Sequence, residues 1–535
     1  MPPEPSYVRV LLPLKLAWLP TYSSPEPLQH GTRVSVALGR RRYDGVVWES
    51  IAQPDLPASR IQPILSVQPE LPEVSDAELR FWRFLSDYYL CTLGEVYKAA
   101  YPLLRLRSEH TAADKLERLR ERLVRKEQDL QRRHTERVQQ RLEAECAALR
   151  GQLEALSASC PPPPPAAPAG SLPTPRLLTG PARREAYLPA VQEALAQGRQ
   201  VLVLSPEIAF CDKLEALLAP ALGARLQLFH SGRTPVERRS VAESLRQGAP
   251  AVVLGTRSAL FLPFRSLGLV LIDEEQDPAY KQTEPAPRYH ARDAAIALAG
   301  IHGARVLLGA AVPSLETLYN VRLGKYSLDT PFAPAPSAAE IIDLGAERRK
   351  RGINGSFSRK LLAAIAQTDG PVVLLRGWEK PQELQEEIAT LLPGRDVTVS
   401  TLSALKRQGA PGAALIGVLQ ADALVSRDDF RSDERAAQLV GTLCQFAPRV
   451  VIQTALPTRF DGSRSLDDLL AERDRFRFPP ATRLVEVKRQ GSGEILERHF
   501  LPRDRSLADR KAAIARSLGA DCYADVDPLD ADLGK

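Results

Sequence analysis

The chain has 535 residues, of which 44% are hydrophobic and 25% charged, and a chain of this length has material for about three or four domains. Its formal net charge of +6 is too small to indicate nucleic-acid binding by itself, so such binding would depend on local patches such as Arg40, Arg41 and Arg42. No run of 18 apolar residues is present, and the start, MPPEPSYVRV, lacks the basic region and apolar core of a signal peptide, so we expect a soluble cytoplasmic protein with no membrane partner.

Short apolar runs alternate with turns across residues 1–104, as in GTRVSVALGRRRYDGVVWES at 31–50. This alternation is typical of β-strands. We therefore predict a small β-rich domain over 1–104 that is closed by a helix.

A charged segment follows at 105–157, in which leucines and a valine recur at nearly heptad spacing. If unbroken, the helix over 112–157 would span about 65 to 70 Å at 1.5 Å per residue. Three interpretations stay open: a dimerising coiled coil, a basic rod along DNA, and an antiparallel helical hairpin or arm packed on its own protein. Residues 158–175 contain CPPPPPAAPAGSLPTP, which predicts a semi-rigid linker.

Apolar strand runs alternate with helical patterns over 176–330 and again over 331–457. Such alternation favours an α/β fold with two lobes, each a parallel sheet covered by helices. The remainder, 458–535, is expected to form a short α+β C-terminal domain.

An acidic quartet follows the run LGLVLI at 267–272, which has the apolar character of a strand buried on both faces of a parallel sheet. Asp273 and Glu274 would then emerge at the carboxyl end of that strand, where open α/β sheets place their ligands. In nucleotide-driven motors one such carboxylate holds Mg²⁺ and the next orients the attacking water. The alternative interpretation is an acidic loop on an unrelated α/β protein.

Residues 255–293, GTRSALFLPFRSLGLVLIDEEQDPAYKQTEPAPRYHARD, resemble almost residue for residue the motor core of the primosomal protein N-prime family, the replication-restart DNA helicases of bacteria in superfamily 2. Other segments resemble the family in chain order, at 81–102, 201–210, 229–232, 307–326, 416–439 and 450–460. The resemblance implies two RecA-like motor lobes, ATP and Mg²⁺ as cofactors, and catalytic positions at Asp273 and Glu274.

The resemblance also implies DNA forks or single strands as partners, together with primosome or replicative-helicase-loading proteins. In the family the N-terminal domain holds the 3′ end of a strand, and the pocket positions fall near Pro20, Thr21, Gly39 and Gln62. This chain keeps Gly39 but lacks the aromatic ring and the lysine of its relatives, which argues against 3′-end selectivity. We take Gly39, Arg40, Arg41 and Arg257 as candidate DNA-binding residues, Arg257 because it lies where helicases touch single-strand phosphates.

The phosphate-binding loop departs from the family. Gly180 is kept at the predicted strand end, but Ala182, Arg183 and Arg184 replace the Gly-Lys-Thr triplet, and Pro181 has no N–H to offer a phosphate. Arginine can attract phosphate, yet it cannot replace the hydroxyl that ligates Mg²⁺. Gly180, Arg183 and Arg184 thus form a degenerate nucleotide site, and we do not expect tight ATP binding.

Two further family features are absent. The segment LVGTLCQFAPR at 439–449 stands where the family has its arginine fingers, and only Arg449 remains near that place. The chain also runs from VVLLRGWEK directly into PQELQEEIATLL, without the eight-cysteine, two-zinc insertion of the family. Six scattered cysteines without a CxxC pair predict no zinc and no other bound metal, and are interpreted as small buried hydrophobic residues: Cys91, Cys146, Cys160, Cys211, Cys444 and Cys522.

Together these losses favour a replication-restart protein that binds forks or single strands as a non-hydrolysing scaffold for primosome or helicase loading. Asp273 and Glu274 are then expected to be idle, because carboxylates without a cation have no evident role. The alternative is an active ATP-dependent 3′-to-5′ DNA helicase with a divergent nucleotide site. A third possibility is a decaying gene product with no present role.

Overall fold

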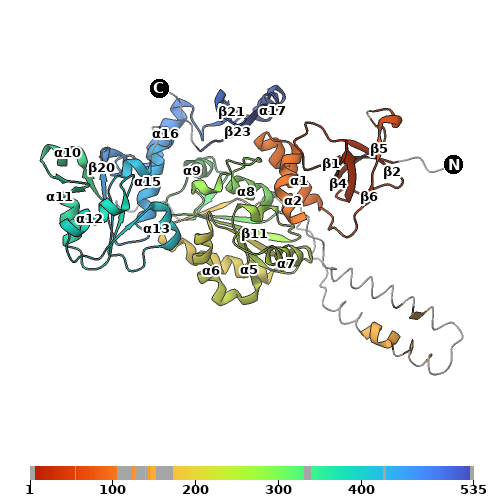
Figure 1. Cartoon of the computed structure of the whole chain (residues 1–535), viewed down its shortest axis with the longest axis horizontal. Helices are drawn as coiled ribbons and strands as arrows, with labels where there is room; N and C mark the ends of the chain where they lie inside the picture. The colour runs from red at the N-terminus through yellow and green to blue at the C-terminus, as the bar shows by residue number, and fades with distance from the viewer. Residues whose placement is uncertain are drawn as a thin grey trace.

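The structure is a computed structural model of the whole chain (Figure 1). It describes residues 6–54, 56–104, 123, 126–127, 139, 142–143, 145–151, 173–329, 339–425 and 429–529. These residues form an N-terminal barrel with two helices, part of a helical segment, two α/β lobes and a C-terminal sheet.

The N-terminal domain is built on a six-stranded sheet in the order β5-β2-β1-β4-β3-β6. Only Ile64 and Leu65 separate β5 from β6, and their amides donate to Ser23 in β2 and Ser35 in β3, at 3.0 and 2.8 Å. This short segment therefore joins the two ends of the sheet into a barrel. The elements are β1 (Ser6–Leu11), β2 (Thr21–Ser24), β3 (Arg33–Leu38), β4 (Arg41–Ile51), η1 (Ala58–Arg60), β5 (Gln62–Pro63) and β6 (Ser66–Val67).

Two helices, α1 (Asp76–Tyr89) and α2 (Leu93–Leu104), follow the barrel and attach it to the first lobe. A capping box between Ser75 and Glu78 starts α1, because it satisfies two of the amides that a helix end leaves free. Aromatic rings continue from α1 into the lobe, where Phe81 lies 6.1 Å from Phe261. The barrel and the lobe therefore share one hydrophobic core.

The charged segment folds back on itself. Lys126 pairs with Glu145 at 2.7 Å and Arg150 with Glu127 at 2.6 Å. Nineteen residues of continuous helix would place Lys126 and Glu145 about 28 Å apart. These ion pairs exclude the unbroken helix and favour the antiparallel hairpin among the three interpretations; most of the segment, and the linker 158–172, lie outside the described residues.

Lobe 1 contains a seven-stranded, fully parallel sheet in the order β13-β7-β12-β11-β8-β10-β9. Alternate residues of β11 enter the cores on the two sides of the sheet, Leu269 and Leu271 on one side and Val270 and Ile272 on the other. The predicted buried strand is therefore confirmed. The strands are β7 (Arg176–Thr179), β8 (Gln200–Leu204), β9 (Leu226–Phe229), β10 (Val252–Gly255), β11 (Leu267–Asp273), β12 (Arg305–Ala310) and β13 (Ser327–Leu328).

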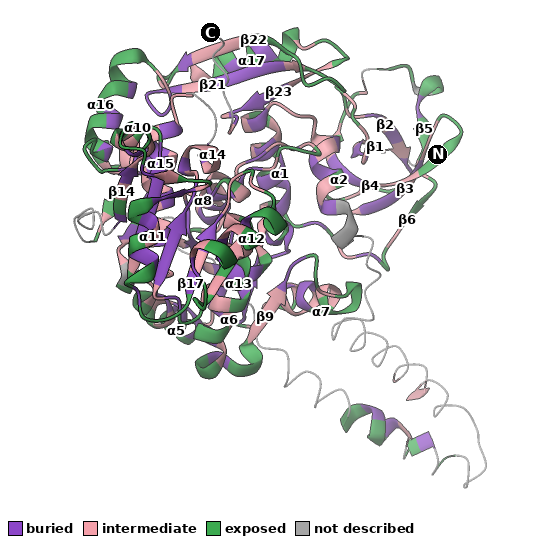
Figure 2. Ribbon diagram, turned by 60° about the vertical axis from the view of Figure 1, so that its left-hand side comes forward, coloured by how far each residue is buried: buried purple, intermediate pink, exposed green. Residues whose placement is uncertain are grey.

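Helices cover both faces of this sheet and carry exposed residues, and the edge strand β9 is half-buried (Figure 2). The inner strands β8, β10 and β11 are almost entirely buried. The helices are η2 (Pro181–Ala186), α5 (Tyr187–Ala196), α6 (Ile208–Leu222), η3 (Gly223–Arg225), α7 (Pro235–Arg246), η4 (Arg257–Phe261), η5 (Pro278–Tyr280), α8 (Ala291–His302) and α9 (Leu315–Arg322).

Lobe 2 contains a five-stranded sheet in the order β14-β20-β19-β17-β18, which is also fully parallel. The prediction of two parallel-sheet lobes is thus confirmed. The elements are β14 (Ala339–Asp343), α10 (Leu344–Arg349), β15 (Ile353–Asn354), β16 (Phe357–Ser358), α11 (Arg359–Ala366), β17 (Val372–Leu375), α12 (Pro381–Leu391), β18 (Val397–Ser400), α13 (Leu402–Gln408), β19 (Leu415–Val418), α14 (Ala421–Leu424), α15 (Ser432–Leu443) and β20 (Arg449–Thr454).

The C-terminal part adds a three-stranded sheet in the order β22-β21-β23. It docks on lobe 1, where the buried Lys281 ammonium binds Asp525 at 2.8 Å and the Val526 carbonyl at 2.7 Å. In the part of the chain that the structure describes, no helix is long and apolar enough to cross a membrane. The elements are η6 (Pro457–Arg459), α16 (Leu466–Phe476), β21 (Thr482–Arg489), β22 (Ile495–Pro502), α17 (Leu507–Ser517) and β23 (Cys522–Val526).

Candidate nucleotide site and nucleic-acid interface

The acidic quartet begins at the carboxyl end of β11, in the middle of the lobe 1 sheet (Figure 1). Asp273 is the last strand residue, and the chain turns at Glu274, whose φ of +52° lies in the left-handed region. This conformation costs a non-glycine residue roughly 1 to 2 kcal/mol. The surrounding contacts must therefore hold Glu274 in place.

Those contacts come from the degenerate phosphate loop. Arg183 forms an ion pair with Glu274, and its guanidinium also donates to the Gly180 carbonyl at 3.0 Å. Arg184 pairs with Asp273 at 2.7 Å and reaches Glu274 at 3.1 Å. The two arginines that replace the lysine and threonine of the family thus bind the two carboxylates directly.

Asp273 is fully buried, and both of its oxygens are engaged. One accepts from Arg184, and the other accepts from the hydroxyl of Tyr187 at 2.8 Å. Tyr187 reaches Asp273 only because position 309 is glycine: a Cβ on Gly309 would lie 1.7 Å from the tyrosine oxygen. The glycine in β12 therefore leaves the space that the hydrogen bond to Asp273 requires.

Burial dominates the protonation equilibria of this cluster. Removal from water, together with the charge of Asp273, raises the pKa of Glu274, and the two arginines only partly offset that effect. The same two causes raise the pKa of Tyr187 well above its ordinary value. Burial opposes the charge of Arg184, but Asp273 and Glu274 together outweigh burial, so the pKa of Arg184 is raised as well.

A magnesium nucleotide does not fit this arrangement. Mg²⁺ needs carboxylate oxygens that are free to ligate it, whereas those of Asp273 and Glu274 are bound to guanidinium groups. The segment Pro181–Ala186 carries no hydroxyl, and the 3₁₀ helix it forms begins with a proline. Two arginines opposite two carboxylates also leave no net charge to attract a phosphate chain.

The opposite lobe contributes a residue that the sequence did not indicate. The Gln445 side-chain oxygen accepts from Arg183 at 3.2 Å. Arg449, the one arginine left near the family's finger place in the sequence, pairs with Glu340 at 3.2 Å within lobe 2. It starts β20, and its side chain lies across the sheet edge beside β14.

Glu275 of the quartet, with residues before and after it, organises the rest of this surface. Glu275 is fully buried and accepts from Arg292 at 2.9 Å and from the amide and hydroxyl of Ser314 at 2.7 and 2.9 Å. Burial, aided by Arg292, lowers the pKa of His290 to about 3, so this imidazole is neutral near pH 7. Arg257 donates to the Lys281 carbonyl at 2.6 Å and is half-buried, so it braces its own lobe.

Three of the four candidate DNA-binding residues lie at one turn of the barrel. Gly39 and Arg40 form the turn between β3 and β4, and Arg41 begins β4; all three are exposed. The hydroxyl of Tyr22 donates to the Ala37 carbonyl at 2.9 Å, which brings the start of β2 beside the end of β3.

The other positions of the expected 3′-end pocket lie at the same end. Gln62 is exposed in β5, which pairs with the start of β2, where Thr21 follows the buried Pro20. The pairing of β5 with β2 thus places Gln62 beside the start of β2, next to Thr21, whereas Arg257 begins η4 in lobe 1.

Metal ligands are a separate question. Among the described residues, no three His, Cys, Asp or Glu side chains are arranged to hold a metal ion. Five of the six cysteines are described, all as free thiols; Cys146 and Cys211 are buried, and Cys91, Cys444 and Cys522 are half-buried. The absence of zinc stays a prediction.

Comparison with known proteins gives one matching family and a set of relatives. Residues 9–102 match the family described as the 3′DNA-binding domain (3′BD) of PriA. The chain is 38% identical over 194 residues to replication restart protein PriA of Chlamydia pneumoniae, which covers 36% of this chain and 26% of that protein. It is 29% identical over 368 residues to replication restart protein PriA of Rickettsia felis, which covers 67% of this chain and 51% of that protein.

Among solved structures, RecG bound to a three-way DNA junction gives a TM-score of 0.37 at 15% identity, over 64% of this chain and 47% of that one. The chain spans about half the length, or less, of the curated relatives it matches. The chain is therefore similar to PriA over these ranges: residues 9–102 match its 3′DNA-binding domain, and two parallel-sheet lobes follow.

Proposed function

We propose that this protein binds DNA forks or single strands in replication restart and acts as a scaffold for primosome or helicase loading without hydrolysing ATP. One observation carries the proposal: Arg183 and Arg184 occupy the carboxylates of Asp273 and Glu274. Both catalytic positions of the family are thereby neutralised by the chain itself.

The energetics support this assignment. The side chains of Arg183 and Glu274 are 1% and 5% exposed. Freeing Glu274 for a water or a metal would break a buried ion pair, which costs about 3 to 5 kcal/mol. A nucleotide would have to supply that free energy before any chemistry, from a loop that lacks the usual donors.

The DNA-binding half of the proposal is supported by the family match and by the exposed turn. Arg40 and Arg41 are exposed at the turn between β3 and β4, next to the expected pocket position Gly39. Their guanidinium groups suit phosphate oxygens, which would fix a strand against the barrel without reading its sequence. Primosome and helicase-loading partners are proposed from the relatives alone.

An active 3′-to-5′ helicase with a divergent nucleotide site is the second candidate. It is favoured by the position of Asp273 and Glu274 at the strand end, and by Arg184, whose side chain is 28% exposed and has room to move. Movement of Arg184 alone would still leave Arg183 bound to Glu274.

DNA-stimulated ATP hydrolysis by the purified protein separates the two candidates, with Asp273→Asn as the isosteric control. We expect equal rates for the two proteins. A clear excess in the unsubstituted protein that Asp273→Asn abolishes would overturn the scaffold proposal and support the helicase.

Fluorescence anisotropy with a labelled fork tests the DNA half separately. Arg40→Ala with Arg41→Ala should weaken binding, whereas a matched pair on the exposed surface of lobe 2, Arg348→Ala with Lys350→Ala, should leave it unchanged. Equal affinity of both variants would exclude the barrel turn as the DNA site.

A further inference from the structure

Three sets of contacts join the lobes away from Arg183. The first links Lys406 in α13 to Asp277 in lobe 1, at 2.7 Å. Asp277 also caps η5 by accepting from the Ala279 amide at 2.9 Å, so a contact within lobe 1 orients the carboxylate that binds Lys406. The two side chains are 18% and 6% exposed, which limits screening by water.

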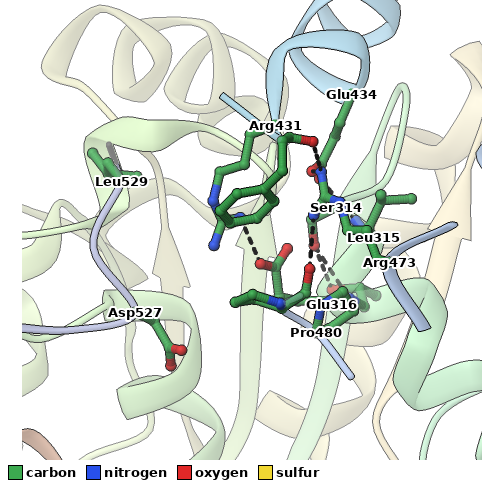
Figure 3. Close-up of polar contacts among 12 residues, drawn as sticks. Ser314, Leu315, Glu316, Arg431, Glu434, Arg473, Pro480, Asp527 and Leu529 are labelled. Carbon is green, nitrogen blue, oxygen red and sulfur yellow. Dashed lines mark hydrogen bonds and ion pairs between the residues drawn. The ribbon is translucent and has the colours of Figure 1, made fainter. Parts of the chain in front are cut away.

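The second contact joins Arg431 of lobe 2 to Glu316 in α9 of lobe 1, at 2.6 Å (Figure 3). Burial by itself would raise the pKa of Glu316, but Arg431, Arg292 and Arg473 outweigh it and hold that pKa well below its ordinary value. Glu316 is therefore ionised at any pH near neutrality, and the pair is permanently charged.

The third contact is made by Glu434 in α15, which bridges three parts of the chain. One oxygen accepts from the Leu315 amide of lobe 1 at 2.9 Å, and the other accepts from Arg473 of α16 at 2.7 Å (Figure 3). Arg473 also donates to the carbonyls of Phe430 and Pro479, at 3.1 Å each. The C-terminal part thereby fastens lobe 2 while lobe 2 holds lobe 1.

Apolar packing backs these polar contacts. The side chain of Leu315 is buried with three leucines of α16. Beside it, α15 approaches lobe 1 so closely that a Cβ on Gly441 would lie 2.3 Å from a methyl group of Val312. Nearer the nucleotide site, the ammonium of Lys213 lies 4.4 Å from the ring centre of Phe446, beside the Arg183–Gln445 hydrogen bond.

We infer that the two lobes form a single fixed unit, whose arrangement is set by the chain's own ion pairs and does not respond to nucleotide. The inference rests on the proposed function, since it assigns to the retained carboxylates and to the lobe interface a structural role in a scaffold. A ligand shifts a conformational equilibrium only by its differential affinity for the two states. Here the ion pairs that join the lobes are made by the chain's own side chains, and the carboxylates of Asp273 and Glu274 are bound to arginines of the same chain.

The Leu315 amide gives a direct readout of this lobe contact. Leu315 is the first residue of α9, after the cap Ser314, so its N–H has no acceptor within its own helix. Its acceptor is Glu434 across the interface, so its hydrogen exchange is slow only while the lobes are together. The adjacent Ser314 amide binds Glu275 within lobe 1 and serves as an internal control.

Hydrogen exchange of the full chain is measured at single-amide resolution, with and without a non-hydrolysable ATP analogue and Mg²⁺. We expect the Leu315 amide to be protected and unchanged by the analogue. In Lys406→Met with Arg431→Met it should exchange at least about tenfold faster while Ser314 stays protected, since each loss of about 1.4 kcal/mol is a factor of ten. The exposed Lys380–Glu383 pair supplies a matched control, Lys380→Met, with no effect expected.

Two results would overturn the inference. One is an unprotected Leu315 amide in the unsubstituted protein, and the other is protection that appears only with the analogue. A separate titration with a fluorescent ATP analogue distinguishes the failures. If the protein binds the nucleotide analogue and the exchange of Leu315 changes with binding, the scaffold proposal is contradicted as well. If the lobe interface is mobile but the protein binds no nucleotide, only the inference of a fixed unit is contradicted.

Discussion

Removing the Arg183 guanidinium tests the internal ion pair most sharply. Arg183→Met keeps most of the side-chain volume but leaves the Glu274 carboxylate, 5% exposed, without its main partner. Removing one partner of a buried pair costs about 3 to 5 kcal/mol. Gln276 still donates to Glu274 at 2.8 Å and Arg184 lies 3.1 Å away, so we expect the lower end, about 3 kcal/mol.

A second substitution restores the balance. Adding Glu274→Gln to Arg183→Met removes both charges and keeps an acceptor for Gln276, so most of the lost stability should return. The double variant should lie within about 1 kcal/mol of the unsubstituted protein, because isosteric neutral replacement of a buried pair is often close to neutral.

The assay is native-state hydrogen exchange at the buried amides of β11, which gives the opening free energy of lobe 1 directly. This avoids assuming a single unfolding transition in a chain of several domains. A change below about 1 kcal/mol in Arg183→Met, or a double variant that is no more stable than Arg183→Met alone, would refute the ion-pair reasoning.

Three further predictions concern other sites. Burial lowers the pKa of His302 from 6.5 to about 4, so the neutral imidazole contributes stability above pH 6.5 that is lost as the pH falls towards 4. When hydrogen exchange is measured from pH 7 to pH 4, the free energy of unfolding of His302→Gln should therefore fall by about 3 kcal/mol less than that of the unsubstituted protein. Equal pH dependence of the two proteins would contradict this. Tyr187→Phe removes a 2.8 Å hydrogen bond to buried Asp273 and should lower the opening free energy measured at the β11 amides by about 2 kcal/mol. An unchanged opening free energy would contradict this prediction. Arg40→Ala with Arg41→Ala should reduce by about 1.4 the magnitude of the negative slope of log affinity for single-stranded DNA against log salt concentration. An unaltered slope would mean that neither residue contacts a phosphate.

The sequence was sufficient for the architecture of the lobes. Apolar runs such as 267–272 became buried parallel strands, because burial on both faces leaves no polar positions in the pattern. The resemblance located Asp273 and Glu274 at the strand end, and the structure agrees with that position. Weak ATP binding, the absence of zinc and the DNA contacts remain predictions, since the structure contains no contact that tests them.

The partners of the two carboxylates were not predictable. Arg183 and Glu274 lie 91 residues apart, and only the parallel order of β7, β12 and β11 brings them together. Arg183 and Arg184 were interpreted as a degenerate nucleotide site and the carboxylates as idle in catalysis. Neither interpretation indicated that each carboxylate has an arginine as its cation. The contact of Gln445 with Arg183 could not be predicted either, since this neutral side chain belongs to no recognised sequence motif.

The helical segment shows a different limit. Heptad spacing serves a long coiled coil and a hairpin equally well, because both bury one apolar stripe. Only contacts such as Lys126 with Glu145 distinguish them, and a pair nineteen residues apart has no signature in a periodic pattern.

The closed barrel has a consequence for handling the protein. Open sheets present unpaired main-chain groups at their outer strands, which invite a further strand from another molecule and so seed aggregation. Here β5 pairs with Tyr22 and Ser23 on the outer side of β2, and β6 pairs with Val34 and Ser35 on the outer side of β3, so part of each outer edge is covered. Proline at Pro63 in β5 further removes one donor from the segment that seals the ring. The domain is therefore well suited to remain monodisperse at the concentrations that strand-binding measurements require.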